Sequence, residues 1–224
     1  GRNNGTIVGN VTTSDSGAIG RSAQFDGDGS YINTSDSSSL DSVFGTENFT
    51  LSAWVYPKDW VNFRGIITKR DNNWYSASPG GLYSDSSGFK FTIGDGNPSS
   101  SANTLAAKPE LLNWYLLTGT VNGTHLHLYL NGVFNSSTPL TVNPPTNDEQ
   151  LRIGQFYGQK SFNGSIDDVM IFNRSLSAAE VAGLYANTSS RYLGINYTGL
   201  EDRNYTFQAY SQDTSGNVNL TEKR

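Results

Sequence analysis

The stretch from Gly164 to Tyr185 reads GSIDDVMIFNRSLSAAEVAGLY and decides the fold class of this chain. Its first half alternates with the period of a β-strand, which predicts a strand at 165–172. Asp167, Val169 and Ile171 would lie on one face of this strand, and the residues between them on the other. Because both faces are largely apolar, we expect the strand to be buried inside a sandwich.

The second half of the same stretch has the start signals of an α-helix. Ser177 and Glu180 have the S-x-x-E spacing of a capping box. Leu176 and Val181 occupy the flanking positions of a hydrophobic staple. Together these residues predict a helix near 178–186.

This strand and helix resemble the C-terminal signature of laminin-G-like, concanavalin A-like jelly rolls, roughly G-x-I-D-D-V-x-I-Y-N-R-x-L-S-x-x-E-I-x-x-L-Y. Four earlier segments match the same family in order and spacing: AQFDG followed by YI at 23–32, FTLSAWV at 49–55, the hairpin at 114–132, and LRIG at 151–154. The resemblance covers about residues 4–186. It implies an all-β, two-sheet jelly-roll sandwich with one short helix near the C-terminal end of the domain.

Strand patterns recur about every ten residues along the chain. They predict strands at 22–26, 30–34, 48–56, 64–69, 73–77, 88–93, 114–121, 124–130, 150–155 and 165–172. Asn122-Gly123, between two of these strands, is the dipeptide most typical of a tight β-hairpin. The expected core residues are Phe25, Leu51, Trp54, Ile66, Phe91, Leu116, Leu128, Ile153, Val169 and Ile171.

The composition excludes several classes of function. The net charge is −5 and no cluster of Lys and Arg is present, so a nucleic-acid-binding surface is not expected. No apolar run approaches the roughly 18 residues of a membrane span. The chain lacks cysteine, which rules out disulfides and thiol chemistry and says nothing about the compartment.

Asparagine is unusually often followed by the acceptor pattern for N-glycosylation. The chain contains 12 Asn-x-Ser/Thr sequons, where chance would give about five. They are at Asn4, Asn10, Asn33, Asn48, Asn122, Asn135, Asn163, Asn173, Asn187, Asn196, Asn204 and Asn219. The excess favours an N-glycosylated extracellular protein, although accumulation by chance in a Ser-, Thr- and Asn-rich β-protein is the alternative. Sequons without cysteine suit an archaeal surface protein better than an animal secreted one.

The two ends of the chain do not match one complete domain. Residues 1–186 resemble the jelly roll without its first strand, and 187–224 read as a β-rich tail similar to the last strands of an immunoglobulin- or fibronectin-III-like domain. The tail could complete the sheet within the chain, or a segment from another copy could fill the gap. A third explanation is that the chain is a piece of a longer precursor, which the absence of a signal peptide also favours.

Catalytic residues are not apparent, so we expect the chain not to be an enzyme. The chain has two histidines, His125 and His127, which lie on one face of the predicted hairpin without a G-x-S-x-G motif. Glucanases of this architecture have a strand of the E-x-D-x-x-E type, which is missing here. Exposed strand histidines are the plainer interpretation.

The family resemblance implies a structural calcium ion near the F-D-G turn and the I-D-D strand. Asp26 and Asp167 match the motif positions, and Asp28 and Asp168 lie beside them. Ser30 stands where the family often has another aspartate, which weakens one expected ligand. We expect Asp167 on the core-side face, where its charge needs either a metal or hydrogen-bond partners.

Aromatic residues in predicted loops are candidates for ligand binding, because sugars stack on exposed aromatic faces. The four selected are Trp60, Trp74, Tyr75 and Tyr157. The rival interpretation is that such rings pack under their own loops. We therefore expect a non-catalytic module of an extracellular, N-glycosylated surface protein, which recognises glycans or surface proteins or serves adhesion. The alternative is a structural subunit of a surface filament or S-layer-like assembly joined by β-strand complementation.

Overall fold

A computed structural model describes the chain over residues 3–61, 63–70, 79–95, 101–105, 108–144, 148–156, 158 and 160–188, and over 203, 205–206, 210–212 and 218–220 in the tail. The chain divides into two compact units, Gly1–Leu193 and Gly194–Arg224. The boundary thus lies seven residues beyond the predicted end of the jelly roll at 186. In the second unit, β15 (Tyr210–Gln212) pairs antiparallel with β16 (Val218–Leu220).

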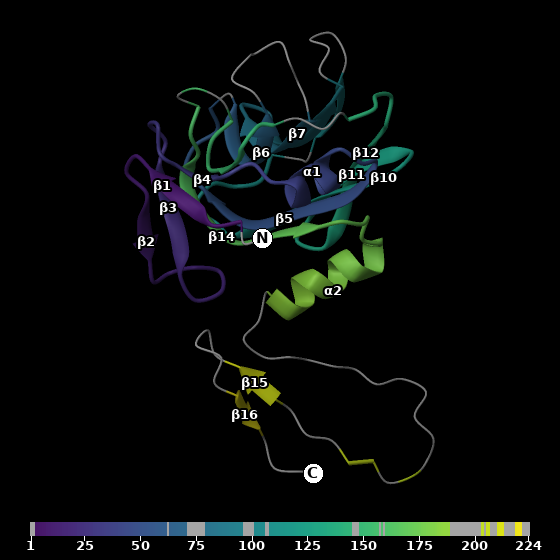
Figure 1. Cartoon of the computed structure of the whole chain (residues 1–224). Coiled ribbons are helices and arrows are strands. Elements are labelled where there is room, and N and C mark those ends of the chain that lie inside the picture. The colour runs from purple at the N-terminus through teal and green to yellow at the C-terminus, as the bar shows by residue number, and fades with distance from the viewer. Residues whose placement is uncertain are drawn as a thin grey trace. The chain divides into compact units, whose positions relative to one another are not determined.

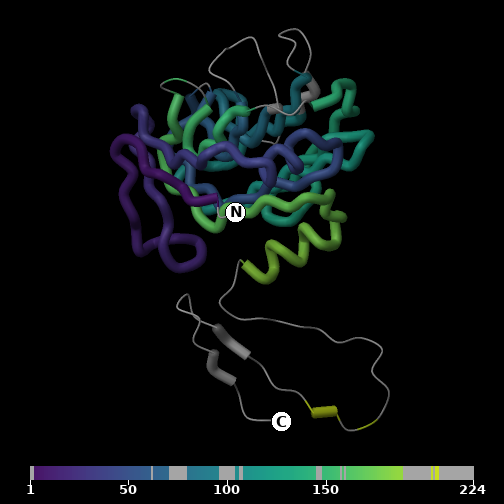
Figure 2. Tube along the Cα trace, viewed as in Figure 1, coloured from purple at the N-terminus to yellow at the C-terminus, as the bar shows by residue number. Residues whose placement is uncertain are grey.

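The first unit is built from two antiparallel sheets of seven strands each, shown in Figure 1 and as a trace in Figure 2. The first sheet has the order β1 (Gly5–Val8), β4 (Tyr31–Thr34), β13 (Leu151–Ile153), β6 (Arg64–Arg70), β7 (Pro79–Asp85), β8 (Gly88–Gly94) and β9 (Ser101–Leu105). The second has the order β12 (Val133–Pro139), β11 (His125–Leu130), β10 (Tyr115–Asn122), β5 (Asn48–Pro57), β14 (Asn163–Phe172), β3 (Ser22–Asp26) and β2 (Thr12–Ser14). The two-sheet sandwich is therefore confirmed.

Most of the predicted strands are present near their expected positions. The predicted strand 73–77 lies outside the described residues. The strands that the sequence pattern missed are β1, β2, β7, β9 and β12. They are short, or they begin with Pro-Gly-Gly, or they are rich in serine and asparagine, so they lack the alternation of large apolar residues on which the prediction rests.

The main core lies between the two sheets. Of the expected core residues, Phe25, Leu51, Ile66, Phe91 and Leu128 are buried in it, and Ile153, Val169 and Ile171 pack against it. Trp54 and Leu116 are a correction. They are paired across β5 and β10 and are buried on the outer face of the second sheet, where the ring of Trp54 lies 5.7 Å from that of Tyr185.

Tyr185 belongs to α2 (Ala178–Thr188), the helix predicted from the capping box. The Glu180 carboxylate accepts a hydrogen bond from the Ser177 amide at 2.8 Å, and the Glu180 amide donates to the Ser177 hydroxyl at 3.3 Å. Leu176 and Val181 are both buried in a small cluster with Tyr129. The capping box is therefore confirmed, and both staple residues are buried.

A second helix, α1 (Ser38–Phe44), corrects the expectation of one helix. Ser37 caps it, and its buried residues Leu40, Val43 and Phe44 have the i, i+3, i+4 spacing of a helix face. Its serine-rich start does not single out a helix, because serine near a helix start is equally typical of a turn.

A β-bulge in β14 corrects the predicted faces of that strand. Asp167 pairs with Trp54 and Met170 pairs with Ser52, so two residues of β14 lie opposite Ala53 of β5. Asp168 has a φ of 46°, a left-handed conformation that aspartate tolerates better than most residues. The extra residue shifts the alternation, so Asp167 faces outward with Trp54 whereas Val169 and Ile171 face the core.

Candidate functional site

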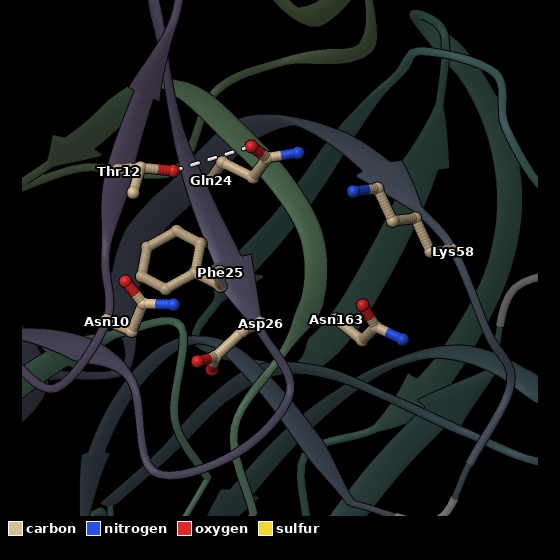
Figure 3. Close-up of a pocket in the computed structure, with 7 residues that line it drawn as sticks. All are labelled: Asn10, Thr12, Gln24, Phe25, Asp26, Lys58 and Asn163. Atoms are coloured by element: carbon tan, nitrogen blue, oxygen red, sulfur yellow. Dashed lines mark hydrogen bonds between the residues drawn. The ribbon is translucent and has the colours of Figure 1, made fainter.

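A polar pocket of about 240 Å³ lies at one end of β2, β3 and β14. It is lined by Asn10, Thr12, Gln24, Phe25, Asp26, Lys58 and Asn163, as Figure 3 shows. Phe25 is buried, whereas the other lining residues are exposed or half-buried. Apart from the buried Phe25, the pocket is therefore lined by carboxylate, amine, amide and hydroxyl side chains.

The strand register brings these side chains together. Gln24 pairs with Thr12 of β2 on one side and with Ser165 of β14 on the other. Asp26, two residues further along β3, pairs with Asn163. Because cross-strand partners and residues two apart share a face of a sheet, these side chains all lie on the outer face of the second sheet.

Asp26 is held by the tight turn that follows β3. Its Oδ1 accepts a hydrogen bond from the Ser30 hydroxyl at 2.6 Å and from the Asp28 amide at 3.0 Å. The Ser30 bond, helped by the Asp28 amide, holds the pKa of Asp26 below its ordinary value. The carboxylate is therefore charged at neutral pH, and a hydrogen bond from the side chain of Asn10 at the pocket also lowers its pKa.

Arg64 connects the turn after β3 to the start of β14. Its Nη1 donates to the carbonyl oxygens of Gly27 and Ser161, both at 2.7 Å. Asp59 lies 3.5 Å from the Arg64 Nη2 and accepts a hydrogen bond from the Asn163 amide at 2.7 Å. This network holds the turn after β3 and the side chain of Asn163 in place beside the pocket, so Arg64 and Asp59 are positioning residues.

Lys58 lies on the side of the pocket opposite Asn10 and Asp26 in Figure 3. Within the described part of the chain, neither Lys58 nor Asp26 takes part in an ion pair. One wall therefore offers a hydrogen-bond acceptor with negative charge, and the other a donor with positive charge. A small ligand that carries several hydroxyl groups could bond to both walls.

The four aspartates selected from the sequence lie in two places. Asp26 lines the pocket and Asp28 lies in the turn that follows β3, whereas Asp167 is four residues further along β14 than Asn163, about 13 Å away. The Asp167 carboxylate accepts hydrogen bonds from the amides of Ile19 and Asp168, both at 2.8 Å. Asp168 lies at the surface, but part of its carboxyl group is shielded from water, and this desolvation, together with the charge of Asp167, raises its pKa. Within the described residues, no three His, Cys, Asp or Glu side chains form a group that could hold a metal ion.

Replacing Asp167 with alanine should lower the free energy of unfolding by about 2 kcal/mol, because the amide of Ile19 loses a charge-assisted acceptor in a part-buried site. Urea denaturation should show this cost equally in calcium and in a chelator. Asp15→Ala, an exposed residue paired with Arg21 in the same loop, is the matched control and should cost less than about 0.5 kcal/mol. A cost that disappears in the chelator would show that Asp167 acts as a metal ligand instead.

Of the four aromatic residues selected from the sequence, only Trp60 can be placed. Its ring lies 5.0 Å from that of Phe89 and packs against the main core, which leaves it half-buried. Trp74, Tyr75 and Tyr157 lie outside the described residues. Three other loop and strand rings, Phe63, Tyr83 and Phe156, pack on one another with centroids 4.5 to 6.2 Å apart.

The sequons differ in how accessible their amides are. Those at Asn4, Asn10, Asn48, Asn122, Asn135, Asn173 and Asn187 are exposed. Asn33 and Asn163 are half-buried, and their amide nitrogens donate to Gln150 and Asp59, both at 2.7 Å. Asn196, Asn204 and the side chain of Asn219 lie outside the described residues. Glycosylation stays a prediction, and we expect it at the exposed asparagines other than Asn10, which lines the pocket.

Two seven-stranded antiparallel sheets around one core define a jelly-roll β-sandwich, which here has a polar pocket on an outer face. The family model of the concanavalin A-like lectin/glucanases superfamily matches residues 26–182, and the chain belongs to this superfamily. A search of curated protein sequences returns no significant match.

Solved structures with the same fold include domain 4 of an extracellular GH43 arabinanase from Geobacillus stearothermophilus, in complex with arabinotriose. It has a TM-score of 0.63 and 22% identity, and the match covers 81% of this chain and 87% of that domain. The binding domain of Paraclostridial Mosquitocidal Protein 1 has a TM-score of 0.66 and 18% identity over 82% of this chain. The binding domain of botulinum neurotoxin DC, in complex with SialylT, has a TM-score of 0.63 and 18% identity over 83%. The match spans 47% of each toxin domain.

Proposed function

We propose that this chain is a non-catalytic glycan-recognition module of an extracellular protein. The observation that supports it most is the pocket itself, which Asp26 and Lys58 both line, and neither of them forms an ion pair with any residue that the structure describes. Sugar hydroxyl groups both donate and accept hydrogen bonds, so a carboxylate on one wall and an amine on the other match them. The amides of Asn10, Gln24 and Asn163 add further donors and acceptors.

The size of the pocket indicates the part of a ligand that it takes. At about 240 Å³ it is smaller than the roughly 300 to 1,000 Å³ that encloses a drug-sized molecule. One sugar ring of a longer glycan would occupy it, and the rest of the chain would extend over the exposed rim. Two fold relatives were solved with arabinotriose and with SialylT, which supports a saccharide as the ligand class.

The proposed extracellular location rests on the sequons and on an extracellular arabinanase, one domain of which has the same fold. Seven sequon asparagines are exposed on the described surface, and six of them lie outside the pocket that Asn10 lines, so sugars attached there would leave the pocket free. Among the described residues, no helix has the length and apolar character needed to cross a membrane. Adhesion through surface glycans, or recognition of glycoproteins, is the role that this combination favours.

Calcium belongs to the proposal as a structural ion at the pocket end of the sheet. Asp26 and the amide oxygens of Asn10 and Asn163 are hard oxygen ligands of the kind calcium prefers. Lys58 adds positive charge to the same space, so we expect weak binding. We expect a chelator to lower the melting temperature. An unchanged melting temperature would contradict the binding of a structural calcium ion.

A glycan array with the whole chain tests the function. We expect binding to a restricted set of saccharides, reduced in Gln24→Ala and retained in Trp60→Ala, because Trp60 is packed against Phe89 rather than at the pocket. Loss of binding in Trp60→Ala with full binding in Gln24→Ala would move the site to the loop aromatics. The absence of binding to any glycan would overturn the proposal.

A further inference from the structure

The polar pocket lies at one end of a row of side chains that crosses the outer face of the second sheet. Gln24 of the pocket pairs with Ser165 of β14, and Ser165 pairs with Tyr56 of β5. The rings of Tyr56 and Trp114 lie 5.5 Å apart at an interplanar angle of 51°, which extends the row to the start of β10. Three strand spacings of about 4.8 Å place the two ends of the row about 14 Å apart. The row therefore continues beyond the pocket, which neither ring lines.

A second row runs beside the first, nearer to the end of the sheet. Asp26 pairs with Asn163, and the Lys58 amide donates to the Asn163 carbonyl at 3.0 Å. On the other side of β5, the Leu112 amide donates to the Pro57 carbonyl at 2.9 Å, which brings Leu112 next to the segment that carries Lys58. Both rows thus change from polar side chains at β3 and β14 to large apolar ones at β5 and β10.

Tyr56 and Trp114 point outward, away from the main core. The residues that precede and follow them, Val55 and Tyr115, belong to the core or pack against it, and successive residues of an extended chain point to opposite faces. Both rings are half-buried, so each keeps part of its surface in water. Large apolar side chains that gather at one exposed place often mark a binding surface.

Leu112 adds a second sign that this place is specialised. Its side chain is 59% exposed, which is unusual for a leucine that lies among other apolar side chains. Its φ of 61° is a left-handed conformation that leucine rarely adopts. Backbone strain of this kind is concentrated at binding sites, where the surrounding structure holds it. Here the hydrogen bond to the Pro57 carbonyl holds Leu112 in place.

We propose that the glycan runs from the polar pocket across β14 and β5 toward β10, and that its next sugar stacks on Tyr56 and Trp114. This inference rests on the proposed function and names its ligand class, an oligosaccharide of at least two units. The first unit presents hydroxyl groups to Asp26 and Lys58. The second presents an apolar C–H face to the two rings, with Leu112 at its border.

Calorimetric titration of the whole chain tests the inference with a trisaccharide selected on the glycan array and with each monosaccharide that composes it. Trp114→Ala removes one ring of the row, and Trp114→Phe keeps an aromatic face. Trp60→Ala is the matched control, because Trp60 is also a half-buried tryptophan but packs against Phe89. Binding of the monosaccharide at the pocket also shows that each variant is folded.

The wild type should bind the trisaccharide roughly tenfold or more tightly than any of its monosaccharides, since an aromatic contact adds to the pocket. Trp114→Ala should lose most of this gain and still bind the monosaccharide as the wild type does. Trp114→Phe should keep most of the gain, and Trp60→Ala all of it.

Two results would overturn the inference and leave the proposed function standing. One is a trisaccharide that binds no more tightly than its monosaccharides, and the other is equal affinity of Trp114→Ala and wild type for the trisaccharide. The absence of binding to any saccharide is a different outcome, because it overturns the proposed function and this inference with it.

Discussion

Replacing Lys69 with alanine should lower the free energy of unfolding by about 3 kcal/mol. Lys69 of β6 is fully buried, and its Nζ lies 2.8 Å from Asp36 and 3.0 Å from Asp41. It also donates to the backbone carbonyl of Glu149 at 2.5 Å. Removal of one partner of a buried ion pair typically costs about 3 to 5 kcal/mol, and we take the lower end because both aspartates keep contact with water.

The ion pairs connect the α1 region to the first sheet. Their loss should therefore loosen the packing of Leu40 and Val43 of α1 in the main core. Urea denaturation measures the cost. Lys69→Met keeps most of the buried alkyl chain and should cost less than Lys69→Ala, whereas Lys160→Ala, at an exposed site, should change stability by no more than about 0.5 kcal/mol. A Lys69→Ala variant as stable as Lys160→Ala would contradict this account of the ion pairs.

The same contact predicts an acid dependence. The hydrogen bond from Lys69 holds the pKa of Asp36 below its ordinary value of 3.8. A carboxyl group with a lowered folded-state pKa stabilises the protein above its unfolded value, and this contribution is lost as the pH falls through the folded value. The difference in the free energy of unfolding between wild type and Lys69→Ala should therefore be largest at neutral pH and should decrease below about pH 3.8.

Replacing Phe25 with alanine should lower the free energy of unfolding by about 3 to 5 kcal/mol. It should also loosen the strand that carries the pocket residues Gln24 and Asp26. Phe25 is 1% exposed and is part of the main core, and it is also one of the residues that line the polar pocket. A Cβ at position 154 would lie 2.3 Å from this ring, so the ring packs directly against the backbone of Gly154. The φ of Gly154 is 87°, a backbone conformation that favours glycine. The truncation would leave a void in the core behind β3, the strand that carries Gln24 and Asp26.

Phe134 provides the matched control, because it is the same residue type at 53% exposure on β12. Phe134→Ala should cost less than about 1 kcal/mol, since little of its surface leaves water on folding. Thermal or urea denaturation of both variants separates the two sites. Equal costs for Phe25→Ala and Phe134→Ala would show that Phe25 is not the anchor between the core and the pocket.

Features that depend on neighbouring residues were predictable from the sequence. The capping box at Ser177 and Glu180 formed as expected, because both of its hydrogen bonds join residues three apart. The hairpin at Asn122-Gly123 formed for the same reason, with Gly123 at a φ of 83°. The fold class followed from such local signals repeated in one order.

Features that depend on distant residues were not predictable. The bulge after Asp167 cannot be read from an alternating pattern, and it moved that residue to the opposite face. The pocket combines the loop before β2 with β3, β14 and the segment after β5. In the sequence, Asn10 and Asn163 stand out only as sequons. Gln24 and Lys58 belong to no binding motif, because only the folded arrangement of the strands brings them to the pocket.

The affinity for a saccharide selected on the array, measured by calorimetric titration of wild type, Lys58→Ala and Lys160→Ala, tests the glycan-binding proposal most directly. A charge-assisted hydrogen bond contributes about 1.5 to 3 kcal/mol, so Lys58→Ala should bind roughly tenfold or more weakly. Lys160→Ala removes the same charge from an exposed site that does not line the pocket and should bind like the wild type. Equal affinities for all three proteins would contradict recognition at this pocket.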